Sequence, residues 1–195
     1  MQESLDKAFL LLKATYKGGG KLLVCGNGGS AADSEHIVGE LMKGFMLSRK
    51  IPQGMRGKIT SVAKANGNYI SNNLQGALPA ISLVSQSALI SAYSNDMAPD
   101  MVFAQQVYGY GRQGDTFLGL STSGNSKNVV YAAETAKALG MNTIAFTGKS
   151  GGLLKDICDC TIAAPSEITP VIQEYHLPIY HKLCMMLEEE FFGEK

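Results

Sequence analysis

The sequence predicts an α/β fold in which a parallel sheet is covered by helices on both faces. Five short apolar runs alternate with stretches of helical periodicity, and this alternation is typical of parallel strands joined by helical crossovers. Glycine-rich loops follow two of these runs, at the carboxyl ends of strands where open sheets bind ligands. The 195 residues suffice for a sizeable core within one domain. We therefore expect a single domain over residues 1–195.

The helices and strands follow from local patterns along the chain. Leu5, Phe9 and Leu12 repeat at helical spacing, and three glycines at 18–20 end this first amphipathic helix over residues 3–16. The predicted strands, each a short apolar run, are residues 21–25, 80–84, 116–120, 143–146 and 160–163. Further helices are predicted over residues 31–45, 101–108, 127–139 and 171–192.

Residues 47–78 interrupt this alternation as an inserted excursion. They contain Pro52, four glycines and four asparagines and show little apolar periodicity. A structureless loop of this length is unusual inside a compact domain. The sequence leaves three interpretations open: a lid, a subunit contact, or local helix around residues 59–65.

Charge and hydropathy exclude several classes of partner. Lys and Arg together number 17, as do Asp and Glu. The chain therefore lacks the broad basic field that drives binding to nucleic acid or to an anionic membrane. No apolar run approaches the roughly 20 residues of a spanning helix, and the polar start shows no signal peptide. We expect a soluble, cytoplasmic protein whose four cysteines are reduced and form no disulfide scaffold.

Two loops rich in glycine and hydroxyl groups predict a phosphate site. They are CGNGGS at residues 25–30 and STSGNS at residues 121–126, each between a predicted strand and a predicted helix. Glycines let the backbone approach a ligand, and free N–H groups at a helix N-terminus attract an anion. A third loop, TGKSGG at residues 147–152, lacks the GxxxxGK[ST] spacing of a nucleotide site. We expect a phosphorylated small molecule and no nucleotide.

Three histidines lie in two of the predicted helices. His36 and Glu40 are four residues apart and share one helix face just beyond the first loop, where they can share a metal ion or a proton. Such a pair is also common as an ordinary contact. Gln173 and His181 are eight residues apart on the last helix, which Pro178 is expected to kink. We assign His176 to the core or to an interface.

Together these motifs resemble the sugar isomerase (SIS) family, and within it the phosphoheptose isomerases. The resemblance rests on CGNGGSAADSEHIVGEL (25–41), SNDM (94–97), GDTFLGLSTSGNSKNVV (114–130), TGKSGG (147–152) and IQEYHLPIYH (172–181). It implies a flavodoxin-like three-layer sandwich, a homotetramer, and aldose–ketose isomerisation of a heptose 7-phosphate. Fewer residues precede the first loop than in most members, and the excursion over residues 47–78 is longer than the family's usual link.

The resemblance also implies roles for individual residues. Glu40 and His181 correspond to the catalytic base and acid. The residues that bind the phosphate in the family correspond to Ser121, Ser123 and Ser126. The residues that make the remaining substrate contacts correspond to Asn27, Gly28, Ser30, Asp96, Thr122 and Gln173. The ligands of a zinc ion correspond to His36, Glu40, Gln173 and His181.

The implied roles agree with the chemistry of the reaction. Moving a carbonyl between C1 and C2 needs a base for a carbon-bound proton, and an acid or a metal for the oxygen of the enediolate. The implied substrate is sedoheptulose 7-phosphate and the product D-glycero-D-manno-heptose 7-phosphate. Two alternatives remain at this point: an isomerase of another sugar phosphate, and a non-catalytic SIS protein that binds a partner such as the replication initiator DnaA.

Overall fold

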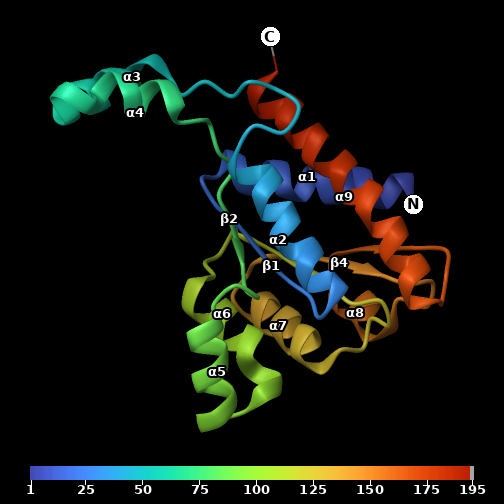
Figure 1. The fold of residues 1–195 in the computed structure, drawn as a ribbon. Coiled ribbons are helices and arrows are strands. Elements are labelled where there is room, and N and C mark those ends of the chain that lie inside the picture. The colour runs from blue at the N-terminus through green and yellow to red at the C-terminus, as the bar shows by residue number, and fades with distance from the viewer. Residues whose placement is uncertain (194–195) are drawn as a thin grey trace.

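A five-stranded parallel sheet forms the centre of the molecule. The structure, a computed structural model, describes residues 1–193 (Figure 1). The strand order is β2-β1-β3-β4-β5, and β1 pairs in parallel with both β2 and β3. The strands are β1 (Leu22–Cys25), β2 (Ala80–Ser82), β3 (Thr116–Leu120), β4 (Asn142–Thr147) and β5 (Cys160–Ala163). This order is that of flavodoxin-like folds, so the predicted α/β class is confirmed.

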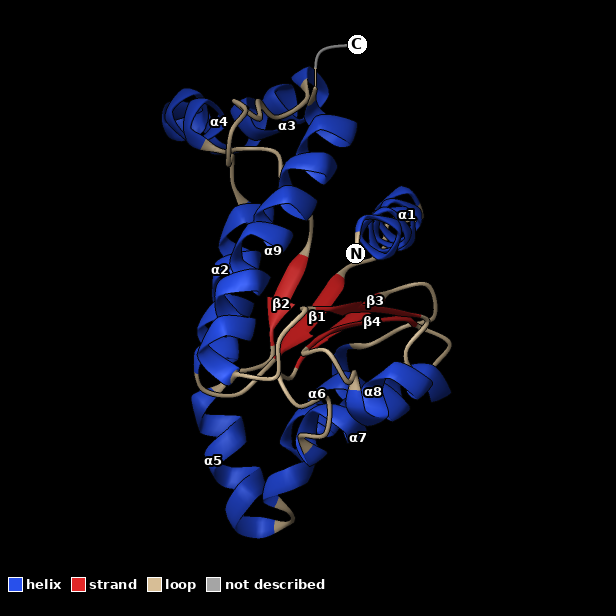
Figure 2. Cartoon of the chain, turned by 90° about the vertical axis from the view of Figure 1, so that its right-hand side faces the viewer, coloured by secondary structure: helices blue, strands red, loops and turns tan. Residues whose placement is uncertain are grey.

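Helices cover both faces of the sheet and complete three layers (Figure 2). One face packs against α1 (Gln2–Lys17), α2 (Gly29–Met42) and α9 (Thr169–Phe192). The other packs against α5 (Ser87–Asp96), α6 (Val102–Tyr110), α7 (Lys127–Ala138) and α8 (Gly152–Ile157). Within β1, Leu22 and Val24 join the first core and Leu23 and Cys25 join the second. A strand that is buried on both faces reads as a continuous apolar run, which is why LLVC was recognisable.

The cysteines are free, and none has the surroundings of a reactive thiol. Cys25, Cys160 and Cys184 are buried, and Cys158 is half-buried. Burial raises the pKa of the Cys25 thiol well above its usual range, and the nearby Cys158 adds to the effect. Cys25 is therefore a small core residue at the end of β1. Within residues 1–193, no helix is both long and apolar enough to span a bilayer.

The excursion over residues 47–78 is largely helical. It contains α3 (Gln53–Ala63), a 3₁₀ turn (Lys64–Asn66) and α4 (Gly67–Asn73). These elements pack against each other and project away from the three layers (Figure 1). We call residues 51–74 the arm. At its base Lys50 forms an antiparallel bridge with Gln75, and the Gly76 amide donates to the carbonyl of Arg49 at 2.6 Å.

His176 is a core residue at the carboxyl end of β4. Its side chain is fully buried, and Nε2 lies 3.1 Å from the carbonyl oxygen of Thr147. An imidazole Nε2–H that donates to this carbonyl leaves Nδ1 without a partner among the described residues. Burial lowers the pKa of His176 below 6.5, although the Thr147 carbonyl and Asp33 act in the opposite direction. The neutral imidazole is therefore the folded form.

The buried His176 predicts a pH dependence of stability. The unfolded chain binds a proton at this residue below its ordinary pKa of 6.5, whereas the folded chain binds it only at a lower pH. The stability that the neutral His176 gives the folded state is present in full above that pH and is lost as the pH falls below it. The free energy of unfolding then changes by at most about 1.4 kcal/mol per pH unit. The measurement is urea unfolding between pH 5 and 8.

His176→Gln removes this part of the slope even if it lowers stability at every pH. An unchanged slope in His176→Gln contradicts the assignment.

Candidate active site

A small cavity lies where the two glycine-rich loops meet. Its volume is about 290 Å³. The loops follow β1 and β3, and the order of strands reverses between these two neighbours, so the cavity lies at the topological switch point of the sheet. It is lined by Asn27, Gly28, Gly29, Ser30, Leu120, Ser121, Thr122, Ser126, Thr169 and Gln173. Three helices, α2, α7 and α9, begin at these residues. Their N–H groups and dipoles favour an anion there.

The first loop requires glycine for two separate reasons. Gly28 has a φ of 56°, a conformation that other residues adopt only under strain. A Cβ on Gly29 would lie 2.6 Å from Nε2 of Gln173. The missing side chain therefore lets α9 place its Gln173 amide directly against the first turn of α2.

The second loop is closed by its own hydroxyl groups. The hydroxyls of Ser121 and Ser126 lie 2.9 Å apart, and the Ser126 amide donates to Oγ of Ser121 at 3.4 Å. Across the cavity, Asn27 and Asn128 exchange two side-chain hydrogen bonds of 2.9 Å, which tie the first loop to α7. Asn128 was not among the predicted site residues, and its amide in the KNVV stretch gave no signal by type or spacing.

Most of the predicted substrate contacts gather in this cavity, but two do not. Ser123 is exposed outside the lining, where its Oγ accepts the Asn125 amide at 3.1 Å. Asp96 is exposed at the end of α5 and accepts from the Asn95 side chain at 2.9 Å. Their predicted roles therefore have no counterpart in the cavity of this single chain. The predicted residues that line it are Asn27, Gly28, Ser30, Ser121, Thr122, Ser126 and Gln173.

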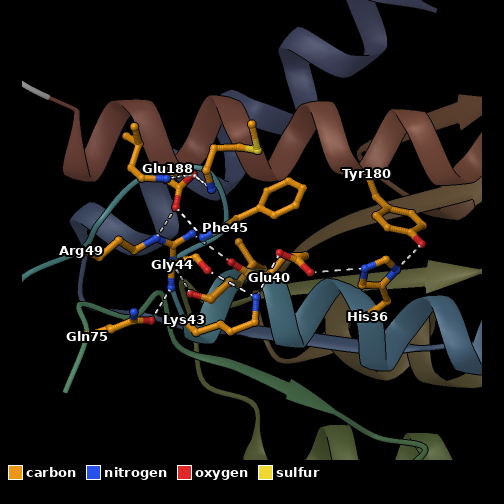
Figure 3. Close-up of polar contacts among 12 residues, drawn as sticks. His36, Glu40, Lys43, Gly44, Phe45, Arg49, Gln75, Tyr180 and Glu188 are labelled. Atoms are coloured by element: carbon orange, nitrogen blue, oxygen red, sulfur yellow. Dashed lines mark hydrogen bonds and ion pairs between the residues drawn. The ribbon is translucent and has the colours of Figure 1, made fainter. Parts of the chain in front are cut away.

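A second cluster lies further along α2 and α9 (Figure 3). Nε2 of His36 is 3.3 Å from Oε1 of Glu40, and Nζ of Lys43 is 3.5 Å from Oε2. Glu40 is 8% exposed, so its carboxylate is largely withdrawn from water beside these two groups. The ring of His181 lies 5.1 Å from that of His36, centroid to centroid, with a T-shaped arrangement. Its Nε2 is buried without a hydrogen-bond partner among the described residues.

The cluster gathers three of the four predicted zinc ligands. Metal–ligand bonds of about 2.0–2.1 Å separate two neighbouring corners of a tetrahedral zinc site by about 3.3–3.4 Å, so the 3.3 Å between His36 and Glu40 fits one edge. The unpartnered Nε2 of His181 is a third candidate donor. Gln173 lies in the loop cavity instead, about 12 Å away along α9 by helical rise. Among residues 1–193, no His, Cys, Asp and Glu side chains form a closed group of three around one point.

Tyr180 and Asp33 orient His36 and were not predicted. The Tyr180 hydroxyl donates to the Asp33 carboxylate at 3.3 Å and lies 2.9 Å from Nδ1 of His36. Burial raises the pKa of Tyr180, and the charge of Asp33 raises it further, so the phenol keeps its proton. Since that proton points to Asp33, the phenolic oxygen accepts from Nδ1–H of His36. Nε2 of His36 faces Glu40, so it is the ring nitrogen that would bind a metal ion at this position.

A buried ion pair holds the C-terminal end of α2. The side chains of Arg49 and Glu188 are 0% and 1% exposed, and Nε of Arg49 lies 2.7 Å from Oε1 of Glu188. The same guanidinium donates to the carbonyls of Leu41 at 2.7 Å and Glu40 at 2.9 Å. These carbonyls belong to the last turn of α2 and have no partner within the helix. Arg49 therefore fixes the backbone that carries Glu40.

Glu188 in turn organises the segment after α2. Its carboxylate accepts the amides of Phe45 and Met46 at 2.8 Å and that of Leu47 at 3.2 Å (Figure 3). Burial alone acts to raise the pKa of Glu188, but these amides and Arg49 outweigh it and hold the pKa below its usual range. The charged run at 188–190 predicts a solvated helix face. For Glu188 this was wrong, because the side chain points into the molecule.

Comparison with known proteins places the chain in a family. A family model described as SIS domain matches residues 1–73 and 59–148. The phosphoheptose isomerase of Clostridium acetobutylicum is 39% identical over 193 residues, which cover 99% of this chain and 85% of that protein. The chain belongs to the phosphoheptose isomerase family of SIS-domain proteins. By membership of this family it is an isomerase.

Other relatives agree with this assignment. A probable phosphoheptose isomerase of Thermoplasma acidophilum is 40% identical over 180 residues, 92% of this chain and 85% of that protein. The solved phosphoheptose isomerase of Neisseria gonorrhoeae superimposes with a TM-score of 0.77 and 32% identity, over 96% of this chain and 86% of that one. The family assignment thus rests on sequence and on fold together.

The Arg49–Glu188 pair predicts a large loss of stability when one partner is removed. Arg49→Met leaves the buried carboxylate of Glu188 uncompensated and exposes the end of α2, so the free energy of unfolding should fall by about 3–5 kcal/mol. The measurement is equilibrium urea unfolding. Lys155→Met, at an exposed cation on α8, should change it by at most about 0.5 kcal/mol.

The double variant Arg49→Met/Glu188→Gln separates charge from packing. It removes both charges and keeps an oxygen that accepts the amides of residues 45–47. It should therefore lose less stability than Arg49→Met alone. Equal losses would show that the pair acts only through shape.

Proposed function

We propose that this protein interconverts sedoheptulose 7-phosphate and D-glycero-D-manno-heptose 7-phosphate through an enediolate. The observation that carries the proposal is the arrangement of α2 and α9. Both helices begin at the phosphate-type cavity, pack against each other and carry the His36, Glu40 and His181 cluster further along. The names of the relatives supply the substrate class, and the SIS membership supports the reaction type.

The distance between the two parts of the site fits a long sugar phosphate. Eleven residues separate Gly29 from Glu40, about 16 Å of helical rise. The side chain of Glu40 leans back toward the start of α2, which shortens the gap by several ångströms. With bonds of about 1.5 Å, an extended seven-carbon sugar spans roughly 10 Å from C1 to the phosphorus. A phosphate bound at Gly29 then brings C1 and C2 toward Glu40, whereas a triose phosphate would fall short.

The residues of the cluster divide the proton transfers between them. The Glu40 carboxylate, whose Oε2 lies 3.5 Å from Nζ of Lys43, takes the proton from C1 of the ketose. The resulting enediolate loses the O1 proton and gains one on O2, a transfer for which the His181 imidazole is suited near neutral pH. Glu40 then returns its proton to C2, which completes the aldose. Tyr180 and Asp33 hold His36 in one orientation beside this carboxylate.

Zinc is the metal we propose for this cluster. His36 and Glu40, 3.3 Å apart, would hold it, and the family resemblance implies His181 and Gln173 as the further ligands, which would have to move closer to meet them. The 3.3 Å spacing and the unpartnered Nε2 of His181 support this donor set. When bound, zinc would polarise the sugar carbonyl as a Lewis acid. We also propose, from the same resemblance, a homotetramer in the cytoplasm.

The test of the function is turnover of sedoheptulose 7-phosphate to the aldose, followed by NMR. Glu40→Gln should lower kcat by roughly 10²–10⁴-fold because it removes the base, while the affinity for the sugar phosphate stays close to wild type. Affinity is measured by calorimetry. Glu35→Gln is the matched control, since Glu35 is an exposed carboxylate on the same helix that accepts from Ser85.

Each other outcome has a definite meaning. Wild-type turnover in Glu40→Gln removes Glu40 as the base. Binding of sedoheptulose 7-phosphate without conversion by the wild type overturns the proposed reaction and leaves a binding protein. Conversion of a shorter sugar phosphate at a higher kcat/KM contradicts the length argument.

The zinc proposal predicts a metal affinity that depends on Tyr180. Tyr180→Phe removes the acceptor for Nδ1–H of His36 and should weaken zinc binding by roughly 10–100-fold. The measurement is equilibrium dialysis with metal analysis by mass spectrometry. Tyr175→Phe, at a partly exposed tyrosine on the same helix, should leave the affinity unchanged. Equal affinities in both variants, or no zinc bound by the wild type, would overturn the proposal.

A further inference from the structure

The arm of residues 51–74 exposes an apolar stripe. Met55, Ile59 and Val62 recur at positions i, i+4 and i+7 of α3, and no residue of α3 is buried. Val62 is 82% exposed, and on α4 Tyr69 is 75% exposed. Helices of 11 and 7 residues are marginal on their own, because packing supplies most helical stability. The arm therefore needs a surface on which to bury this stripe.

The arm cannot use the body of its own chain in this conformation. Its base is fixed by the Lys50–Gln75 bridge, by the Gly76 amide on the Arg49 carbonyl, and by Gln75 Oε1, which accepts the Gly44 amide at 2.8 Å. Gly76 also lies against the ring of Phe192, where a Cβ would come within 2.5 Å. These contacts direct the arm outward at the C-terminal end of α9 (Figures 1 and 2).

The surface area of the chain points to a missing contact of standard size. Folded monomers of 20.8 kDa expose about 8,900 Å², whereas this chain exposes 9958 Å². The excess of about 1,000 Å² is close to the roughly 800 Å² that each partner buries in a typical specific interface. Exposed apolar residues make up much of the arm, so burial of this area would be favourable.

Charge favours a second copy of the same chain as the partner. Arg56, Lys58 and Lys64 belong to the arm, and no Asp or Glu occurs between Glu40 and Asp96. Because the whole chain has 17 residues of each sign, removing the arm's three cations leaves 14 against 17, a net charge of −3. A positive arm and a negative body complement each other between two copies.

A groove with the matching chemistry lies between α1 and α9. It has a volume of about 680 Å³, and its apolar lining is Phe9, Met46, Leu47, Met185 and Met186. Its acidic lining is Glu188, which pairs with Arg49, Glu190, which pairs with Lys13 and Lys17, and the exposed Glu189. The stripe of the arm is apolar with flanking lysines at 58 and 64, so it complements the apolar lining and the carboxylate of Glu189.

We propose that the arm of one copy lies in the α1–α9 groove of a second copy, and that the second copy's arm lies in the groove of the first. The arm lies at the end of the molecule where α9 ends (Figure 1), and α9 carries the groove residues Met185, Met186, Glu189 and Glu190, so a twofold axis between the copies allows both contacts at once. The proposal rests on the self-association proposed above but not on the substrate or the reaction. It assigns the excursion over residues 47–78 to a contact between subunits.

Site-directed cross-linking tests this arrangement on the full chain. Val62→Cys protein is mixed with a size-tagged Met185→Cys protein and treated with a short bismaleimide. We expect a mixed cross-linked dimer in high yield. The wild type measures background from the native cysteines, of which only Cys158 is not buried. Mixing Val62→Cys with Tyr108→Cys, an exposed site on α6, should give only background.

Two further variants keep the test independent of any one substitution. Val62→Asp should weaken association by roughly tenfold to a hundredfold in analytical ultracentrifugation. Replacing residues 51–74 with Asn-Gly joins Lys50 to Gln75 across their existing bridge and should abolish the contact without lowering the melting temperature of the body.

The outcomes separate this proposal from the one on which it rests. A wild type that is monomeric at micromolar concentration overturns both. An oligomer without Val62–Met185 cross-links, or one that persists without the arm, overturns only the arm contact. Arm-dependent binding of DNA or of anionic vesicles by a monomer would show that the basic arm has a different partner.

Discussion

The buried contact between Arg49 and Glu188 determines how three otherwise separate segments meet. The guanidinium satisfies the last carbonyls of α2, and the carboxylate satisfies the amides of residues 45–47. Among the ion pairs of residues 1–193, the pair of Arg49 and Glu188 is the only one in which both side chains are almost inaccessible to water. Burying two charges is costly, and the cost is offset here because nearly every donor and acceptor has a partner. The chain therefore leaves α2 in a fixed direction, which determines both the position of Glu40 and the direction of the arm.

In the proposed mechanism, the two neighbouring helices α2 and α9 separate binding from chemistry. Gly29 and Gln173, near the starts of these helices, are in contact because the glycine has no Cβ. The helix dipoles make the two N-termini favourable for an anion. The proposed proton-transfer groups lie further along, where the dipole contributes little and side-chain contacts such as Tyr180 with His36 decide orientation. Under this proposal, the pair of helices selects for the length of the sugar phosphate.

The sequence predicted the sheet and the loops because their causes are local. LLVC at 22–25 is apolar on both faces, as a buried strand requires. The glycines within 26–29 indicate a turn from strand to helix. Helix α5 was missed because SALISAYSND has weak propensity and is shaped by packing of Ile90 and Tyr93. The internal position of Glu188 was missed for the same reason, since a charged run gives no sign of which member turns inward.

The site shows the same division between local and long-range causes. His36 and Glu40 were recognisable as a pair because four residues of helix bring them together. The contribution of Tyr180 and Asp33 depends on how α9 packs on α2, across 147 positions of sequence. Spacing along one helix also separates Gln173 from His181, so a family pattern read along the chain does not by itself say which groups meet in one subunit.

The closed base of the arm has a consequence for its dynamics. Because Lys50 and Gln75 face each other, residues 51–74 can order or fray without disturbing the sheet, which makes them a separate cooperative unit. In the proposed assembly their helices gain further burial when a second copy is present, so their order would follow protein concentration by mass action. Dilution would then unfold the arm before it affects the body. The monomer would be the form most sensitive to proteolysis, with cleavage at the exposed Lys58 and Lys64.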